Sequence, residues 1–275
     1  MLENFVFENH LGKRFEGLKN RVFLNENELR DYSWSYNTLN GKITRFYRSV
    51  ESKKIPLIVY CETEEKALEI KNQLHEMAEV DIAAEIPGKI YVGDYYAKGY
   101  ITASEKSDYL ITKRLCQLTL TFTTDDASWY REERHAFPVN AKSELSAGGF
   151  EYPYDYPYDY TLATNGKRIV CDSVKSNAFK LRIFGYAKNP SITIGGHHYT
   201  INGTVGAGES LLIDSVNKTI VLTTATGAQI NWFDKRNRAS YIFEPIPSGQ
   251  NTVTWSGSFG FDLTVIEKRS EPKWT

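Results

Sequence analysis

Two pairs of adjacent acids are the residues in this 275-residue chain whose types most suggest catalysis. They are Asp125-Asp126 and Glu132-Glu133. Paired carboxylates serve glycoside hydrolysis, one as the acid and the other as the base or nucleophile. Successive side chains in a strand point to opposite faces, so neither pair forms a ready two-carboxylate site. We therefore expect no enzymatic activity and assign no catalytic residues.

Two adjacent histidines are the residues that most suggest a metal site. His197-His198 follows Gly195-Gly196, and in a strand the two rings diverge. Cys, Asp and Glu are absent at ligand spacing around them, so a metal site is not expected. The glycine-rich stretch 203–208 has no helix after it, which argues against a phosphate cradle. We expect neither a metal nor a cofactor.

Composition and charge exclude several further classes of protein. Lys and Arg number 33 against 34 Asp and Glu, so the net charge is −1 and no general attraction to nucleic acid or acidic membrane is expected. The short basic cluster Lys235-Arg236-Asn-Arg238 is flanked by polar residues. Three cysteines stand far apart, and Cys61 and Cys116 lie in apolar runs, which favours buried free thiols. Nothing resembles a signal peptide or a membrane span, so we expect folding in a reducing cytoplasm.

A tyrosine ribbon divides the chain. Tyrosine occupies every second position from Tyr152 to Tyr160, which places the rings on one face of an extended backbone. Pro153 and Pro157 exclude a helix there. The ribbon is interpreted as a rigid connector, with a sugar-stacking platform as the alternative. We expect a first domain over 1–136 and a second over 137–275, which includes a connector and first strand over 143–160.

The first domain is predicted to be an antiparallel β assembly carrying one helix. Apolar residues at helical spacing, together with Thr63 as a cap, predict that helix at about 63–79. Its stripe consists of Ala67, Ile70, Leu74, Met77 and Ala78. His75 is expected on the solvent-facing side of this helix, which docks on the sheet. Strands are predicted to resume at Asp81–Ile86.

Two hairpins are predicted within this domain. Asn40-Gly41 favours a type I′ turn that leads into a strand over Lys42–Arg48. The preceding run Asp31–Tyr36 alternates, with its aromatic residues on one face. The segment Lys89–Lys98 turns at Gly93-Asp94, and we expect its edges to be free to add to the sheet of a neighbouring subunit.

The second domain is predicted to be a two-sheet β-sandwich without a helix. Strand-length runs alternate with turn residues at intervals of about 8–12 residues, which is typical of sandwiches. The predicted strands are Lys180–Phe184, Ser191–Ile194, His198–Ile201, Ser210–Ile213, Thr219–Thr223, Tyr241–Phe243, Thr252–Trp255 and Phe261–Ile266.

In motif order, the chain resembles the distal tail proteins of long-tailed phages that infect Gram-positive hosts. In the first domain the resemblance is carried by Asn40–Arg45, Lys54–Val59, the helix, Pro87–Tyr100, the long strand that precedes Asp125 and Asp126–Tyr130. In the second it is carried by Gly149–Tyr160, Gly208–Asp214, Phe243–Val253 and Glu267–Trp274. Together these motifs cover nearly the whole chain.

The resemblance implies a ring-forming first domain and a galectin-like sandwich. It implies a homo-hexameric hub at the virion tail tip, which joins the tail tube protein to the tail-tip protein. The sandwich would offer a place for receptor-binding proteins. Neither sequence-specific nucleic acid binding nor membrane binding is implied, and no motif of this family assigns catalytic residues.

A carbohydrate-binding protein is the alternative function. Its sandwich would recognise cell-wall sugar through Trp232, Trp255 or the tyrosine ribbon. That function requires these aromatic rings to be exposed.

Overall fold

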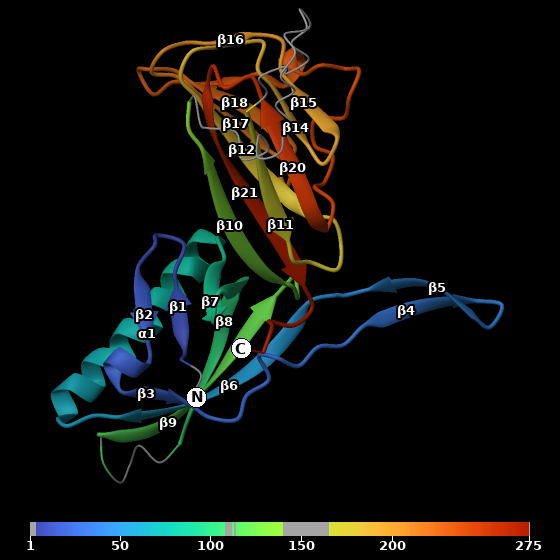
Figure 1. The fold of residues 1–275 in the computed structure, drawn as a ribbon. Coiled ribbons are helices and arrows are strands. Elements are labelled where there is room, and N and C mark those ends of the chain that lie inside the picture. The colour runs from blue at the N-terminus through green and yellow to red at the C-terminus, as the bar shows by residue number, and fades with distance from the viewer. Residues whose placement is uncertain (1–3, 108–111, 113, 140–164, 275) are drawn as a thin grey trace, which may run out of the picture. The chain divides into compact units, whose positions relative to one another are not determined.

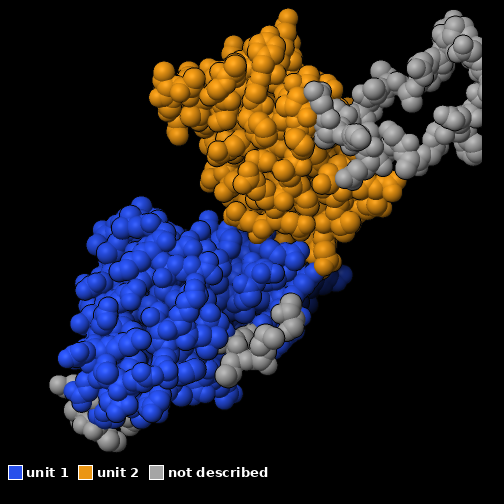
Figure 2. All heavy atoms as spheres, turned by 60° about the vertical axis from the view of Figure 1, so that its left-hand side comes forward, with its two compact units in different colours: residues 1–131, 268–275 blue, residues 132–267 orange. Residues whose placement is uncertain are grey.

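The computed structural model describes residues 4–107, 112, 114–139 and 165–274. They form two compact units (Figure 2): unit 1 comprises residues 1–131 and 268–275, and unit 2 comprises residues 132–267. The chain is mainly β, as predicted, and the strands pair antiparallel. The tyrosine ribbon lies outside the described residues.

Unit 1 carries one α-helix and most of its strands before the chain crosses into unit 2 (Figure 1). Its elements are β1 (Val6–Glu8), β2 (Arg14–Glu16), the 3₁₀ turn η1 (Leu18–Asn20), β3 (Val22–Leu24), β4 (Ser35–Leu39), β5 (Lys42–Tyr47), β6 (Glu51–Tyr60), α1 (Glu64–Ala84), β7 (Gly88–Val92), β8 (Tyr95–Ser107), β9 (Leu115–Thr124) and β10 (Trp129–Phe137), which continues into unit 2.

The long strand β8 belongs to both halves of the unit 1 sheet. Residues 95–99 pair with β7, whose other edge pairs with β1. Residues 100–107 pair with β9, which also pairs with β6. Gly99 lies at the change of partner, where a Cβ atom would come 2.5 Å from the carbonyl oxygen of Thr123. A glycine is therefore required where β8 crosses from one half to the other.

Helix α1 covers this sheet with the predicted stripe. Thr63 Oγ1 accepts a hydrogen bond from the Lys66 amide at 3.3 Å, and all five stripe residues are buried. The predicted strand over Asp81–Ile86 is wrong, because the helix continues to Ala84. Asp81 extends the buried face, and its carboxylate accepts hydrogen bonds from the His10 amide at 2.8 Å and faces His10 Nδ1 at 2.7 Å. Because Asp81 is an acid on the buried face, the apolar pattern in the sequence does not show that the helix continues beyond residue 79.

The prediction that the Lys89–Lys98 hairpin has free edges is also wrong. Strand β7 is paired on both sides, by β1 and β8, and β8 pairs with β10 through Tyr96 and Tyr130. This hairpin is therefore interior to the sheet. The predicted turn at Asn40-Gly41 is confirmed, because both residues have positive φ, at 50° and 76°, and β4 pairs with β5.

Unit 2 is the predicted two-layer sandwich. One sheet has the order β19-β18-β17-β12-β21-β10 and the other β11-β20-β14-β15. The elements are β11 (Asn165–Cys171), β12 (Ala178–Phe184), β13 (Ala187–Lys188), β14 (Ser191–Ile194), β15 (His197–Thr200), β16 (Thr204–Val205), β17 (Ser210–Asp214), β18 (Thr219–Thr223), β19 (Gln229–Asn231), the 3₁₀ turn η3 (Phe233–Lys235), β20 (Gly249–Trp255) and β21 (Gly260–Arg269), whose last residues return to unit 1.

The core of unit 2 lies between these sheets and centres on an aromatic cluster. The rings of Phe137 and Phe261 stack at 4.4 Å, and Trp255 meets both edge-on. Most predicted strands are confirmed, but Tyr241–Phe243 forms a turn instead. Ile242 and Phe243 are buried from that turn, so their apolar character reflects packing onto the sandwich end and not strand pairing.

Candidate assembly surface

The most exposed element of unit 1 is the arm, defined as the β4–β5 hairpin from Ser35 to Tyr47 (Figure 1). Every residue of both strands is exposed, although the arm carries several large apolar side chains. Tyr36, Leu39 and Phe46 are 57%, 66% and 58% exposed. An isolated two-stranded hairpin is marginally stable in water, and exposed apolar surface of this kind marks an interaction site.

One face of the arm carries an exposed aromatic pair. Tyr36 and Phe46 are directly opposite in the register, and their rings lie 6.4 Å apart, edge to face. Asn37 and Arg45 form the next pair, and because neighbouring positions alternate they occupy the other face. We call the face that carries Tyr36 and Phe46 the apolar face. The opposite face is mixed, because Leu39 and Tyr47 share it with Asn37 and Arg45.

The root of the arm is fixed by buried cations. The Lys53 ammonium donates to the carbonyl oxygen of Glu28 at 3.1 Å and to that of Asp31. Burial lowers the pKa of Lys53, and the Glu51 carboxylate opposes that shift. Arg48 pairs with Glu51 at 3.0 Å, while its Nε and Nη1 are buried without a partner among the described residues. The root is therefore held in place but leaves hydrogen-bond donors unused.

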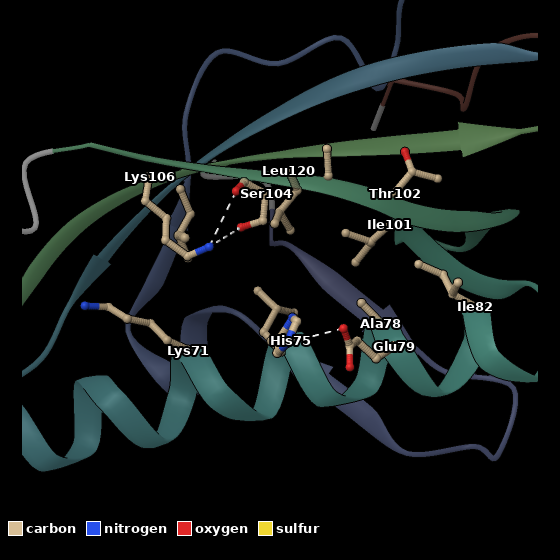
Figure 3. Close-up of a pocket in the computed structure, with 13 residues that line it drawn as sticks. Lys71, His75, Ala78, Glu79, Ile82, Ile101, Thr102, Ser104, Lys106 and Leu120 are labelled. Carbon is tan, nitrogen blue, oxygen red and sulfur yellow. Dashed lines mark hydrogen bonds and ion pairs between the residues drawn. The ribbon is translucent and has the colours of Figure 1, made fainter.

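A second feature of unit 1 is the helix groove, which lies between α1 and residues 101–106 of β8 (Figure 3). It encloses about 280 Å³, and its floor consists of buried aliphatic side chains such as Leu74, Ile101 and Leu120. His75 Nε2 lies 3.5 Å from Glu79 Oε1 on the helix side, and Lys106 Nζ donates to Ser104 Oγ at 3.2 Å on the strand side. An apolar floor with a polar rim suits the insertion of a partner's side chain.

The paired acids are engaged in structural contacts. Asp126 accepts hydrogen bonds from the Tyr130 hydroxyl and, at 3.1 Å, from Lys268. Burial by itself would raise the pKa of Asp126, but hydrogen bonds from Tyr130, Ser128 and Lys268 outweigh it and lower the pKa. An acid held ionised in this way is a poor proton donor for glycoside hydrolysis.

Glu133 lies beside His135 in β10, with 3.5 Å between Glu133 Oε1 and His135 Nε2. Burial lowers the pKa of His135 from its usual 6.5. The Glu133 carboxylate opposes this shift in pKa, and the Lys167 ammonium adds to it. Because the folded state disfavours the protonated ring, His135 contributes stability above pH 6.5 that is lost as the pH falls toward its lower folded pKa.

We predict that His135→Gln makes the stability of the protein less sensitive to acid. Urea unfolding between about pH 7 and pH 5 should show a smaller loss of unfolding free energy in this variant than in the wild type. His75→Gln is the matched control, because His75 is exposed on α1. Equal pH slopes for the wild type and His135→Gln would contradict the assignment.

The paired histidines diverge as expected. His197 Nε2 lies 2.8 Å from the carbonyl oxygen of Tyr241, and His198 Nδ1 lies 2.9 Å from Thr193 Oγ1. Within the described ranges, no group of three or more His, Cys, Asp or Glu side chains is placed to hold a metal ion. All three cysteines are buried and free, as predicted for Cys61 and Cys116. No helix in the described part of the chain is long and apolar enough to cross a membrane.

Of the two tryptophans expected to bind sugar, one is buried and the other is partly buried. Trp255 is 4% exposed, and its Nε1 donates to the carbonyl oxygen of Phe259 at 3.1 Å. Trp232 is partly buried against the core and covers Gly203. The tyrosine ribbon lies outside the described residues. The burial of the two tryptophans counts against the hypothesis that they bind sugar.

Neither a protein-family model nor a curated protein sequence matches the chain. Among solved structures, it is similar to the Dit protein of phage SPP1, described as a hub adsorption apparatus paradigm in phages that infect Gram-positive hosts. The TM-score is 0.59 at 12% identity, with 98% of this chain and 100% of that chain covered. The chain has the Dit fold. Chains of the activated phage P2 baseplate, with calcium and with strontium, agree at a TM-score of 0.59 and 13% identity, covering 99% of this chain and 100% of theirs.

The Dit fold confirms the architecture implied by the sequence resemblance, namely a β assembly with one helix followed by a sandwich. What sequence reasoning missed is the exposure of the arm, because the prediction assigned subunit contacts to the Lys89–Lys98 hairpin. A signal for the arm was present in the sequence. Asn40-Gly41 lies between two predicted strands that both carry apolar residues. The same pattern fits a buried hairpin, so it does not predict that the arm is exposed.

Proposed function

We propose that this protein is a structural component of a phage tail tip that forms a hexameric hub ring. The observation that carries the proposal is the arm, whose Tyr36 and Phe46 side chains are more than half exposed in the single chain. The structural neighbours are described as a hub adsorption protein and as parts of a baseplate, which supports the tail-tip role.

The geometry of unit 1 supports self-association. The arm leaves one surface and the helix groove opens on another, so a contact between them joins two different patches. Such a contact is heterologous, and it generates a closed ring when the rotation between copies closes.

Within this proposal, unit 1 forms the ring and unit 2 forms the outer sandwich. The predicted domains over 1–136 and 137–275 differ from these units mainly because residues 268–275 return to unit 1. One face of the ring meets the tail tube protein and the other meets the tail-tip protein, while the sandwich holds receptor-binding proteins. The protein acts through contacts and not as an enzyme, and it is made in the host cytoplasm and resides at the virion tail tip. The engagement of Asp126 and Glu133 in structural contacts supports the absence of catalysis.

We predict sixfold rings when the purified protein is viewed by negative-stain electron microscopy. Native mass spectrometry of the same sample should give six copies of a 31.4 kDa chain. If the protein closes only on its partners, rings should form on addition of the tail tube protein. A strictly monomeric protein both alone and with tube protein would overturn the ring.

A further inference from the structure

A groove in unit 2 brings cations and aromatic rings together at the basic cluster noted in the sequence. It encloses about 480 Å³ and lies where η3 and the following loop meet the turn between β17 and β18. The side chains that define it are those of Lys218, Phe233, Arg236, Arg238, Tyr241 and Phe243. We call it the basic groove.

The backbone under the basic groove is rigidly held. The Asn237 amide donates to the carbonyl oxygen of Thr200 at 3.1 Å, and the Asn202 amide donates to that of Lys235 at 2.7 Å. Ser240 Oγ donates to the carbonyl oxygen of His198 at 2.8 Å. The loop is therefore tied to β15 and its surroundings, so its side chains are displayed from a fixed frame and a ligand need not order them from a mobile loop.

Positive charge in the basic groove exceeds negative charge. Lys218 and Arg238 have no hydrogen bond or ion pair with any side chain in the described part of the protein. Arg236 lies 3.9 Å from Asp234, but that carboxylate is 94% exposed, so the pairing is weak. Three cations thus face a single solvated acid, which favours an anionic ligand.

Aromatic rings also line the basic groove. Phe233 and Tyr241 are 37% and 49% exposed, and both rest against the buried ring of Phe243, at 6.1 Å and 5.9 Å. The Arg236 guanidinium lies 4.0 Å above the Phe233 ring and donates from Nη1 to the Phe233 carbonyl oxygen at 2.7 Å. These two contacts hold the Arg236 guanidinium in one orientation. The half-exposed Tyr241 ring offers an apolar surface on which a ligand ring can stack.

We propose that the basic groove binds an anionic saccharide, meaning a sugar ring that carries a phosphate or a carboxylate. The anion would lie against Arg238 and Lys218, and the apolar face of the sugar would lie on Tyr241. The volume suits a ligand of one or two rings. This activity is independent of the hub ring, since every residue that it uses belongs to unit 2.

Other occupants match the groove less well. A neutral sugar would leave the cations without a partner, and inorganic phosphate would leave the Tyr241 ring unused. A single-stranded nucleic acid offers both charge and rings, but it binds along a cationic track longer than one or two rings, and the chain has a net charge of −1. The test therefore includes all three as competing probes.

The experiment titrates the full-length protein with glucose 6-phosphate and with glucuronate, followed by ligand-observed NMR and calorimetry. Glucose, inorganic phosphate and an oligothymidylate are the comparison probes. At least one anionic sugar should bind at least about tenfold more tightly than glucose and than phosphate, because charged hydrogen bonds and ring stacking are then both available. Comparing the two sugars identifies phosphate or carboxylate as the preferred anion.

Two variants and one control assign the binding to this groove. Arg238→Gln and Tyr241→Ala should each weaken the preferred anionic sugar by about tenfold. Lys188→Gln removes the same charge from an exposed position outside the groove and should leave binding unchanged. Circular dichroism should show the same spectrum for all four proteins.

Several outcomes would overturn the proposal. They are equal binding of glucose and the anionic sugars, tighter binding of oligothymidylate than of either, absence of binding to both anionic sugars, and an equal loss in Lys188→Gln and Arg238→Gln. None of these outcomes bears on ring formation, which microscopy tests separately.

Discussion

The double variant Tyr36→Ser/Phe46→Ser should abolish ring formation and leave a folded monomer. Both side chains lie on the apolar face of the arm and are more than half exposed in the single chain, so their removal costs the fold little. In the ring they would be buried, where an aromatic anchor contributes about 2 kcal/mol or more. Losing two anchors should weaken each contact about a thousandfold.

The matched control is Asn37→Ser/Arg45→Ser, which alters the neighbouring cross-strand pair on the opposite face. Analytical ultracentrifugation at several concentrations measures the association of both variants, and urea unfolding measures their stability. The control should assemble like the wild type. If Tyr36→Ser/Phe46→Ser still forms rings, or if both variants lose them equally, the apolar face of the arm is not the contact.

The second large effect is expected from Gly99→Ala, which should unfold much of unit 1 while leaving unit 2 intact. The new Cβ atom would come 2.5 Å from the Thr123 carbonyl oxygen and 2.7 Å from Phe122 Cζ. The first of these is backbone in β9 and cannot move aside without breaking the pairing of β8 with β9. We expect a loss of about 3 kcal/mol or more in the stability of unit 1.

Hydrogen exchange separates this effect from a general loss of stability. Amides of β9 should lose protection in Gly99→Ala, while amides of β12 in unit 2 keep theirs. Gly12→Ala serves as the control. Its φ is 80°, but a Cβ atom there meets nothing within 4 Å, so only the backbone strain of about 1 kcal/mol applies. Equal protection of β9 in the two variants would show that the crossing of β8 tolerates a side chain.

Local patterns in the sequence predicted the elements whose stability is local. The apolar stripe of α1 and its Thr63 cap correctly predicted where the helix starts. Asn40-Gly41 correctly predicted the turn of the arm. Asp81 hid the last turn of the helix, because its burial depends on His10, a residue 71 positions away. A partner at that distance cannot be read from helical spacing.

The environment of each element could not be predicted, since burial depends on which strands become neighbours. The β7–β8 hairpin and the arm have similar sequence signatures, yet the first is interior and the second is fully exposed. The Tyr241–Phe243 run shows the same limit, because its apolar residues pack from a turn. The basic cluster at 235–238 was recognised, but its aromatic neighbours come from the folding of η3 and the following loop.

The chain enters and leaves unit 2 at points that lie close together in unit 1. Lys268, where the chain returns, reaches Asp126 at 3.1 Å and lies 5.3 Å from the ring of Tyr130, just before the point of departure. The sandwich is thus an insertion with adjoining ends. We expect that a replacement domain with similarly close termini can be exchanged there without redesigning unit 1.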